Sequence, residues 1–576
     1  MRITIFDIVL VFFGFILNTF FREIKSRGSH NIPKEGPIIF IGAPHANAFV
    51  DGLLLMKYSK RSVFLMIAQN AIRYGHYVGI LARAIHAIIL NRPKDLAEPG
   101  KGKIFLDENK GDPLRIIGIN TEFTKQLKVG YQISLPREYG LSEITEIISD
   151  TEIVIKKEFK EPKALEVLTQ SGGTSYTCMP YVDQSNLYEI VFKMLNAGKC
   201  IGVFPEGRSH DRSEFIPLKA GVAFMTLGAM AANPGLDVKI VPCGLNYFQP
   251  HKFRSRAVIE FGSPISIPPE LIEKYNNSGS DRREACNKLM TIIYERLKLL
   301  AVIAPDYETL SVVRAARRLC RPEHRKLEID EMIDLDRRLI NGYIKFQNDS
   351  NVQEIYKKVK EYDQLLKYNR LKDYQVHKIT TVKFRALVSL LYRIFILVLC
   401  SILALPGLIL NLPLIVKAQI VSAKKAEAAL KGSYIIIRGS HVIATWKILV
   451  SFKVIPVSYG IYTLIALSLA YKYNWGFIMN FGIFSPIIIL TMLFMNSYVT
   501  IRLFDFGTDL YRSLFPLILT LSPSSKSTIK KLRKVRDELS YEIIEIINEI
   551  GPKIYSDFDN ACIIRQLKEI KSKVSK

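Results

Sequence analysis

The chain has 576 residues and a formal net charge of +25, and 49% of its residues are hydrophobic. This charge predicts an anionic partner, and the positive mean hydropathy of +0.14 favours a lipid bilayer over nucleic acid, since the sequence holds no zinc-finger spacing, RNP1-like string or basic heptad pattern. Seven scattered cysteines without a Cys-x-x-Cys pair argue against a disulfide framework and a cysteine zinc site, and favour a reducing, cytosol-facing compartment.

Residues 1–21 form the first expected element, a strongly apolar stretch that is interrupted by Asp7. A signal peptide is one interpretation, but no small-residue cleavage site follows. Basic residues come next instead, at Arg22, Lys25 and Arg27. We therefore expect an uncleaved membrane anchor whose basic flank lies in the cytosol.

Residues 22–300 alternate short apolar runs with helical stretches. Short apolar runs bounded by turn residues are typical of buried strands. The runs are Ile38–Gly42, Val63–Ile67, Ala87–Leu90, Ile201–Phe204 and Val238–Val241. Helical patterns lie between them, at Gly52–Tyr58, Ala71–Ala84, Leu187–Asn196 and Ala220–Ala232. This alternation predicts an α/β domain with its chemistry in loops at the strand ends.

Residues 107–180 interrupt that alternation. They hold pieces rich in β-branched residues and separated by Gly and Pro, namely Ile116–Thr121, Gln132–Leu135 and Glu152–Phe159. We expect a small β insertion within the α/β domain.

Beyond residue 300 the pattern changes twice. Residues 301–385 are helical and highly charged, which predicts amphipathic helices. Residues 386–520 are predicted to be a transmembrane region of three to four spans, because uncharged runs approach or exceed the roughly 20 apolar residues that a span needs. The runs are Ile394–Val416, Val454–Tyr471 and Tyr473–Ile501, and the residues that would break the first into a hairpin are Pro406, Asn411 and Pro413. Residues 521–576 are expected to be a basic cytosolic tail.

The string PHANAFVD places His45 six residues before Asp51. Histidine suits general-base work because imidazole titrates near neutrality, and a neighbouring carboxylate fixes its tautomer and stabilises the imidazolium. A His–Asp pair at this spacing is commonplace by itself. On one continuous helix the two side chains would not meet, so the pair needs a bend near Ala46–Ala48. Asn47 is a competing side chain for the same role.

The string FPEGRSHD closes an apolar run with a turn that presents the carboxylate of Glu206 and the guanidinium of Arg208. Gly207 lets backbone amides approach an anion closely, and arginine holds phosphate through a bidentate fork. Lys219 follows in PLKAG just before a predicted helix, whose N-terminus also favours anions. A structural Glu–Arg pair is the alternative for an isolated turn. Together these residues predict an anion site.

No metal site is predicted. The other histidines are dispersed, without the i, i+4 pairing or carboxylate neighbours of a metal site. His210 and Asp211, beside the FPEGR turn, are the only pair that could be considered, and we expect them to be polar residues at the surface. The sequence also lacks a P-loop and a dinucleotide fingerprint, so we expect no cofactor.

The chain resembles the glycerolipid acyltransferase (PlsC-like) superfamily, because counterparts of its four blocks occur in order. They are PHANAFVD, AIILNRPKD with Arg92 at the end of a strand, FPEGRSHD, and IVPCGLNYF around Pro242. More specifically, the chain resembles the fungal-type glycerol-3-phosphate/dihydroxyacetone-phosphate acyltransferases. The strings that carry this likeness are RPKDLAEPGKGKI, the insertion with ISLP and EIISDTE, and IIIRGSHVIATWKILV.

The resemblance implies a role for each block. It makes His45 the catalytic base and Asp51 its orienting partner. The blocks that bind the acceptor correspond to Arg92, Glu206 and Gly207, with Arg208 as an added positive charge beside them. Pro242 belongs to the block linked to the acyl-CoA side, although a proline at a strand edge can equally be structural. Five residues separate His45 from Asp51 in place of the family's usual four, which puts their contact in question.

The implied activity is transfer of a fatty acyl group from acyl-CoA to the sn-1 hydroxyl of glycerol-3-phosphate or dihydroxyacetone phosphate. We expect direct transfer without an acyl-enzyme, because no Gly-x-Ser-x-Gly elbow is present. Acyl-CoA is a co-substrate, and no cofactor is expected. The resemblance also implies a multi-pass protein of the endoplasmic-reticulum membrane, with the catalytic domain facing the cytosol. No nucleic-acid partner and no particular oligomeric state are predicted.

Two alternatives stay open. The four blocks do not separate this activity from acylation of lysophosphatidic acid or another lysophospholipid, and the insertion and the ATWK segment favour the first. A transporter or non-catalytic membrane scaffold fits the spans and the basic charge. Coupled transporters tend to place charged groups at mid-membrane, however, and no charged residue interrupts the three uncharged runs.

Overall fold

The computed structural model describes residues 5–72, 76–106, 112–170, 172–277, 279–320, 327–369, 371, 373–378, 383–476, 480–521 and 525–555. The chain divides into two compact units. The first comprises Met1–Ala301 and Ser422–Thr445, and the second comprises Val302–Val421 and Trp446–Lys576. The short segment Ser422–Thr445 therefore belongs with the N-terminal half of the chain, although its neighbours in sequence do not.

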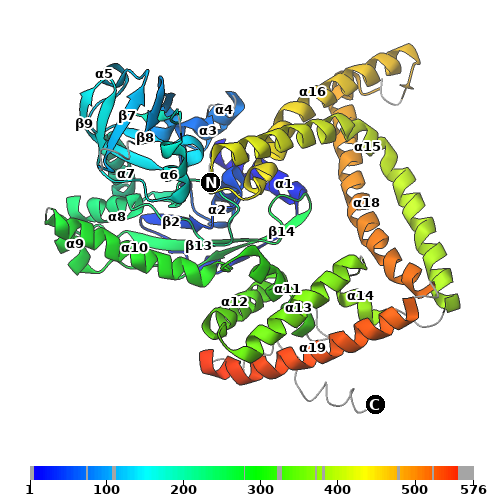
Figure 1. Ribbon diagram of the computed structural model, residues 1–576. Coiled ribbons are helices and arrows are strands. Elements are labelled where there is room, and N and C mark those ends of the chain that lie inside the picture. Colours follow the sequence, from blue (N-terminus) through cyan, green and yellow to red (C-terminus); the bar gives the residue numbers. More distant parts are fainter. Residues whose placement is uncertain are drawn as a thin grey trace. The chain divides into compact units, whose positions relative to one another are not determined.

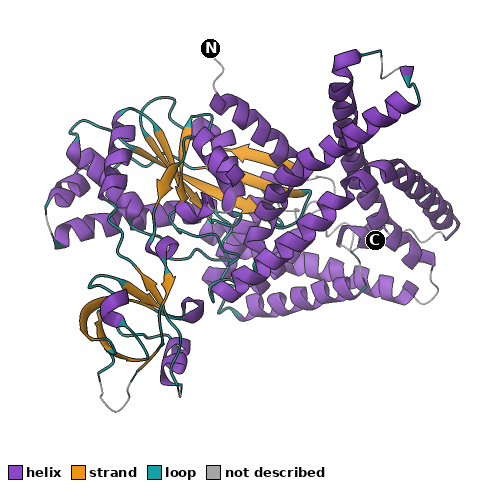
Figure 2. Cartoon of the chain, turned by 90° about the horizontal axis from the view of Figure 1, so that it is seen from above, coloured by secondary structure: helices purple, strands orange, loops and turns teal. Residues whose placement is uncertain are grey.

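A seven-stranded sheet forms the centre of the first unit, with the strand order β1-β14-β13-β2-β12-β3-β4 (Figures 1 and 2). Its strands are β1 (Phe21–Arg27), β2 (Ile38–Ala43), β3 (Val63–Ala68), β4 (Ile88–Leu90), β12 (Cys200–Val203), β13 (Lys239–Tyr247) and β14 (Ser255–Phe261). All neighbours are parallel except β13 and β14. The five predicted strands are confirmed, whereas β1 and β14 were not predicted.

Helices cover both faces of this sheet, which is why its central strands read as continuous apolar runs. On one face, Ile39 and Ile201 pack in a core with helices α7 (Ser185–Asn196), α8 (Gly221–Ala232) and α10 (Ser280–Leu300). On the other face lies α2 (Ala48–Tyr58), with a run of buried leucines. The expected helix over 71–84 is present as α3 (Gln69–Ile72) and α4 (His76–Ala84), and residues 73–75 lie outside the described residues.

The expected N-terminal anchor is helix α1 (Ile5–Phe20). One of its faces packs on α2, where the rings of Phe13 and Phe49 lie 5.8 Å apart. Its opposite face exposes Val11, Phe12 and Phe15. The described apolar stretch, Leu10–Phe20, is shorter than a membrane span, so anchoring by this segment stays a prediction.

The β insertion is a second seven-stranded sheet, antiparallel throughout, with the order β5-β11-β8-β9-β10-β7-β6. Its strands are β5 (Glu98–Pro99), β6 (Lys103–Phe105), β7 (Arg115–Ile119), β8 (Gln132–Ser134), β9 (Leu141–Ser149), β10 (Glu152–Ile155) and β11 (Thr177–Met179). It has a hydrophobic core of its own, which includes Ile116, Ile133 and Ile153. The sheet thus begins a few residues before the predicted insertion, at Glu98.

The second unit contains a helical bundle formed by α11 (Tyr307–Cys320), α12 (Ile329–Phe346), α13 (Ser350–Tyr368), α14 (Asp373–Lys378) and α19 (Ser525–Ile554). Leu319, Val359 and Leu539 share its core. The α19 helix, which falls in the expected tail, therefore packs its apolar side inside the bundle.

Three helices of the described residues are long and apolar enough to cross a membrane. The first, Phe384–Gly432, lies within α15 (Lys383–Gly432). The second, Ser440–Lys472, comprises η5 (Ser440–Val442) and α16 (Ile443–Lys472), and the third, Gly482–Leu521, comprises η6 (Gly482–Phe484) and α18 (Ser485–Leu521). Pro406 and Pro413 lie inside α15, which continues through both prolines, so the run is not broken into a hairpin and gives a single candidate span. These findings confirm the predicted fold class.

Candidate active site

The motif blocks meet at one edge of the central sheet. Strands β2, β12 and β13 are parallel neighbours, so their carboxyl ends lie side by side. His45 follows β2, Glu206 follows β12, and Tyr247 ends β13. In open α/β sheets this edge is where ligands bind, so the topology alone brings the distant blocks together.

His45 and Asp51 are in direct contact. The Nδ1 atom of His45 lies 2.8 Å from Oδ2 of Asp51, and the aspartate is fully buried. Because the carboxylate accepts, Nδ1 carries the proton and Nε2 is left with a free lone pair. The imidazole stacks on Phe204, with ring centroids 4.3 Å apart. This arrangement suits a general base.

The bend that this contact needs is present. Helix α2 begins only at Ala48, which has a φ of 32°, so His45 lies on the loop before the helix. The N–H of Asn47 donates to the same Oδ2 atom of Asp51 at 2.9 Å, and its side-chain amide donates to the Pro250 carbonyl. The five-residue spacing is therefore accommodated by a turn at the helix N-terminus.

Tyr247 completes the surroundings of Asp51 and was not predicted. Its hydroxyl donates to Oδ1 of Asp51, the oxygen that His45 does not use. Burial, together with the neighbouring carboxylate, raises the pKa of Tyr247, so the phenol keeps its proton and remains a donor. Tyr247 lies in the block IVPCGLNYF, but its separation from Asp51 in sequence left no local signal of the contact.

Glu206 is buried and holds the backbone of the His45 loop. Its Oε2 accepts the N–H of His45 at 2.6 Å, and its Oε1 accepts the N–H of Ile216 at 3.3 Å. The carbonyl of His45 accepts the N–H of His210 at 3.0 Å. These contacts fix the position of the histidine, and the role of Glu206 in acceptor binding stays a prediction.

The expectation that His210 lies at the surface is wrong. Its side chain is buried, with Nε2 at 2.8 Å from Oε1 of Glu206 and Nδ1 accepting the N–H of Arg212. A polar ring is stable there because both nitrogens have partners. His210 and Glu206 thus form a second pair, which contacts the backbone of His45.

Gly207 forms the turn after Glu206, and Lys219 packs against this turn. Gly207 has a φ of +68°, a backbone conformation that favours glycine, and a Cβ atom there would lie 2.8 Å from Cε of Lys219. Burial, together with the neighbouring Arg92, Arg208 and Lys94, lowers the pKa of Lys219. The lysine therefore lies among other cations, as expected for part of an anion site.

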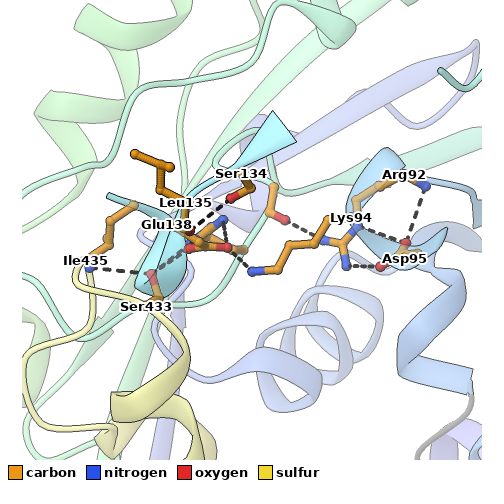
Figure 3. Close-up of polar contacts among 10 residues, drawn as sticks. Arg92, Lys94, Asp95, Ser134, Leu135, Glu138, Ser433 and Ile435 are labelled. Carbon is orange, nitrogen blue, oxygen red and sulfur yellow. Dashed lines mark hydrogen bonds and ion pairs between the residues drawn. The ribbon is translucent and has the colours of Figure 1, made fainter. Parts of the chain in front are cut away.

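Arg92 lies just after β4 and forms hydrogen bonds with other parts of the protein. It donates two hydrogen bonds to Asp95, at 3.0 and 2.8 Å, and a third from Nη1 to the Gly207 carbonyl at 2.8 Å (Figure 3). Arg92 thus joins two of the blocks. Binding of the acceptor by Arg92 stays a prediction.

Arg208 points toward the β insertion. It donates to both carboxylate oxygens of Glu138 in the short helix η4 (Pro136–Glu138), and Nη1 also lies 3.2 Å from Oγ of Ser433. Lys94 of η2 (Pro93–Leu96) donates to the same carboxylate. The predicted guanidinium is therefore part of a larger ionic cluster.

The segment between the first two spans packs on the FPEGRSHD turn. Asp211 accepts the backbone N–H groups of Ile437, Arg438 and Ser440 at 2.9, 2.8 and 3.1 Å. Arg212 donates to the Ile435 carbonyl at 2.8 Å. Although burial opposes it, these amide donors lower the pKa of Asp211. Asp211 is therefore a docking residue for residues 435–440, which its sequence context did not suggest.

Pro242 lies inside β13, opposite Ile41 of β2. It is buried, and its carbonyl accepts the N–H of Gly262 at 2.9 Å. None of the contacts among the described residues joins it to His45. Its assignment to the acyl-CoA side stays a prediction.

Two parts of the chain match known family models. Residues 145–246 match the acyltransferase family model, and residues 312–555 match the model of the glycerol-3-phosphate acyltransferase 2 C-terminal domain. The solved structure of the 1-acyl-sn-glycerophosphate (LPA) acyltransferase PlsC from Thermotoga maritima aligns with 51% of this chain and 79% of its own, with 10% identity and a TM-score of 0.26.

Three curated fungal proteins are similar over nearly the whole chain. An uncharacterized acyltransferase of Schizosaccharomyces pombe is 41% identical over 96% of this chain and 82% of its own. Glycerol-3-phosphate O-acyltransferase 1 of Saccharomyces cerevisiae is 40% identical over 95% and 71%, and glycerol-3-phosphate O-acyltransferase 2 of the same yeast is 33% identical over 96% and 78%. The chain therefore belongs to the fungal-type glycerol-3-phosphate acyltransferases.

Proposed function

We propose that this enzyme transfers a fatty acyl group from acyl-CoA to the sn-1 hydroxyl of glycerol-3-phosphate, with dihydroxyacetone phosphate as a second acceptor. This is the first step of glycerophospholipid and triacylglycerol synthesis. The family supports the reaction class, since two of the relatives are named for glycerol-3-phosphate. The observation that carries the mechanism is the 2.8 Å contact of His45 with a fully buried Asp51.

In the proposed reaction, Nε2 of His45 removes the proton from the acceptor hydroxyl. The hydroxyl oxygen attacks the thioester carbonyl, the bond between carbon and sulfur breaks, and the imidazolium returns its proton to the CoA thiolate. Asp51 stabilises the imidazolium in the meantime. General-base catalysis of this kind contributes roughly 10²- to 10⁴-fold.

The acceptor phosphate is proposed to bind at the cationic end of the same edge, where Arg208 and Lys219 supply positive charge. Binding there holds the hydroxyl near His45 and converts a bimolecular step into an effectively intramolecular one. Direct transfer needs no acyl-enzyme, and the proposed mechanism uses no metal ion or other cofactor.

The three candidate spans indicate a membrane protein. We propose the endoplasmic-reticulum membrane as its location, with the catalytic domain on the cytosolic side. There acyl-CoA would enter from the bilayer surface and the acylated product would partition into lipid.

The proposal is tested by supplying membranes that contain the full chain with labelled acyl-CoA and, in turn, glycerol-3-phosphate, dihydroxyacetone phosphate and lysophosphatidic acid. We expect labelled monoacyl product from the first two acceptors. Labelled phosphatidic acid from the third acceptor alone would instead establish the lysophospholipid activity. No transfer to any of the three would contradict the enzymatic function.

A further inference from the structure

The carboxylate of Glu138 is surrounded by donors from three other segments of the first unit (Figure 3). Arg208 donates to both of its oxygens, and Lys94 donates to Oε1. Ser433, in the segment between the first two spans, donates to Oε2 at 2.6 Å. A forked guanidinium, an ammonium and a hydroxyl thus converge on one anion.

This set of donors is typical of a phosphate site, and it is larger than a structural carboxylate requires. Arginine forks and lysine ammonium groups are the usual phosphate ligands, and a hydroxyl supplies a third direction of approach. A simple ion pair would use one cation, whereas here the carboxylate receives two cations and a hydroxyl. The geometry is that of an anion subsite which already holds an anion from the protein itself.

The cluster also carries more positive charge than the Glu138 carboxylate neutralises. The cations Lys94, Arg208 and Lys219 influence one another, since the first two lower the pKa of Lys219, while Arg92 is neutralised by Asp95. Three cations and one carboxylate leave a positive excess. A phosphomonoester carries about −1.5 to −2 charges at pH 7 and would balance it.

The backbone that carries Glu138 is strained. Arg137 and Glu138 have φ angles of 54° and 61°, a conformation that costs energy for residues other than glycine. Strain of this kind persists only where surrounding contacts impose it. The ionic contacts of Glu138 are thus among the contacts that hold the η4 turn in this conformation, together with backbone hydrogen bonds such as that from Tyr434 to the Arg137 carbonyl.

We propose that Arg208, Lys94 and Ser433 form the phosphate subsite of the acceptor, and that the Glu138 carboxylate occupies this subsite until a phosphomonoester displaces it. The inference rests on the proposed function, because the phosphate that the subsite would bind belongs to the proposed acceptor. It adds Lys94 and Ser433 as ligands and makes the insertion a competitor with the substrate. Acceptor binding then also releases the η4 turn.

The subsite is open to a small anion from solution. The side chains of Lys94 and Arg208 are 49% and 30% exposed, so water and phosphate reach them. Burial raises the pKa of Glu138, but the hydrogen bonds from Arg208, Lys94 and Ser433 outweigh it and lower the pKa to about 2. Glu138 is thus ionised at neutral pH, and exchange requires a competing anion.

The test measures binding of inorganic phosphate to the purified full chain in detergent, by titrating its thermal unfolding temperature. Glu138→Gln is expected to lower the apparent Kd for phosphate by about fivefold or more, because the competing state is removed. Lys94→Met is expected to raise it about tenfold, the effect of losing one charged hydrogen bond. Steady-state assays should show the same changes in KM for glycerol-3-phosphate, with KM for acyl-CoA unchanged.

The matched control is Glu122→Gln, which removes a carboxylate that pairs with Lys101 elsewhere on the insertion. Phosphate affinity should not change in this variant. An unchanged or weaker affinity in Glu138→Gln, or an equal gain in Glu122→Gln, overturns the inference. If Glu138→Gln fails to fold, Lys94→Met decides by itself, since this exposed lysine is replaceable, and unchanged phosphate affinity there overturns the subsite.

The two proposals fail in different ways. If the enzyme acylates glycerol-3-phosphate but its phosphate affinity is insensitive to both variants, the subsite is wrong and the function stands. If phosphate affinity changes as expected but no phosphorylated acceptor is acylated, the subsite stands and the function is wrong.

Discussion

His45 and Asp51 are held by hydrogen bonds within a buried sheet edge, whereas Arg208 and Lys94 are held by ion pairs that water reaches. We call the first region the dyad half, which consists of His45, Asp51, Glu206 and Tyr247. Its side chains are joined by short hydrogen bonds, and Asp51 is fully buried. In the second, the anion half (Lys94, Glu138, Arg208 and Lys219), long side chains from separate segments meet.

We interpret this difference in terms of the two proposed tasks. A general base must keep one geometry and one tautomer, which backbone and buried partners provide. A phosphate subsite must release one anion and accept another, which exposed ion pairs allow because each is of modest strength in water. We therefore expect changes in the dyad half to lower kcat, and changes in the anion half to alter KM for the acceptor.

The largest effect is expected for Asp51→Asn. An amide cannot accept both the His45 and Tyr247 protons with the correct polarity, so the imidazole tautomer and the stabilisation of imidazolium are lost. The same change in a serine-protease triad lowers kcat about 10⁴-fold, and we expect a loss of about 10³- to 10⁴-fold. Steady-state kinetics checks it against Asp183→Asn at an exposed helix start. A loss under tenfold would contradict the role of the dyad.

Glu206→Gln comes next and separates positioning from acceptor binding. The amide leaves one donor of His45, His210 or Ile216 unpaired and lets the loop that carries His45 shift. Small displacements of catalytic groups cost up to about 10²-fold, so kcat should fall about 10- to 100-fold with KM for glycerol-3-phosphate unchanged. The exposed Glu146→Gln is the control. A raised KM with normal kcat would show that Glu206 binds the acceptor instead.

Tyr247→Phe is expected to have a smaller effect. It removes one hydrogen bond to Asp51 without changing the size of the ring. Such a bond is worth about 1 kcal/mol, which corresponds to about a fivefold loss of kcat. Tyr181→Phe, at a residue that is 70% exposed, should leave kcat unchanged. Equal kcat in both variants would show that the hydrogen bond from Tyr247 does not support the His45–Asp51 pair.

The anion half should also show a dependence of stability on pH. The contacts of Glu138 lower its pKa from 4.5 to about 2, so its ionised form stabilises the folded protein above about pH 4.5, and this contribution is lost as the pH falls toward 2. The unfolding temperature of Glu138→Gln should lie below that of the wild type at pH 7, with a difference that shrinks below about pH 4.5. A difference that is constant from pH 7 to pH 3 would mean that the ion pairs contribute nothing.

Local patterns in the sequence predicted the His45–Asp51 pair and the centre of the sheet. Strands such as β2 are buried on both faces and therefore stand out as apolar runs, and His45 and Asp51 are close in the chain. The edge strand β1 was not predicted, because exposed charged residues such as Arg22 and Glu23 interrupt its apolar positions. An edge strand with exposed charges has no apolar run to mark it.

The anion half was only partly predicted, because its contacts join residues far apart in sequence. Arg208 was identified from its turn, but its partners Glu138 and Ser433 come from the insertion and from the segment between two spans. Similarly, the burial of His210 depends on the Glu206 carboxylate lying beside it. No periodicity or spacing in the sequence indicates such pairings, because only the tertiary fold brings these residues together.

The division of tasks between the two halves is tested most directly by His45→Ala in the purified full chain, with His30→Ala at an exposed histidine as the control. We expect acyl transfer to glycerol-3-phosphate to fall about 10³-fold or more in His45→Ala, the contribution of a general base. Its affinity for inorganic phosphate and its unfolding temperature should match those of the control. Transfer within tenfold of the control, or a loss of phosphate binding together with turnover, would contradict the account.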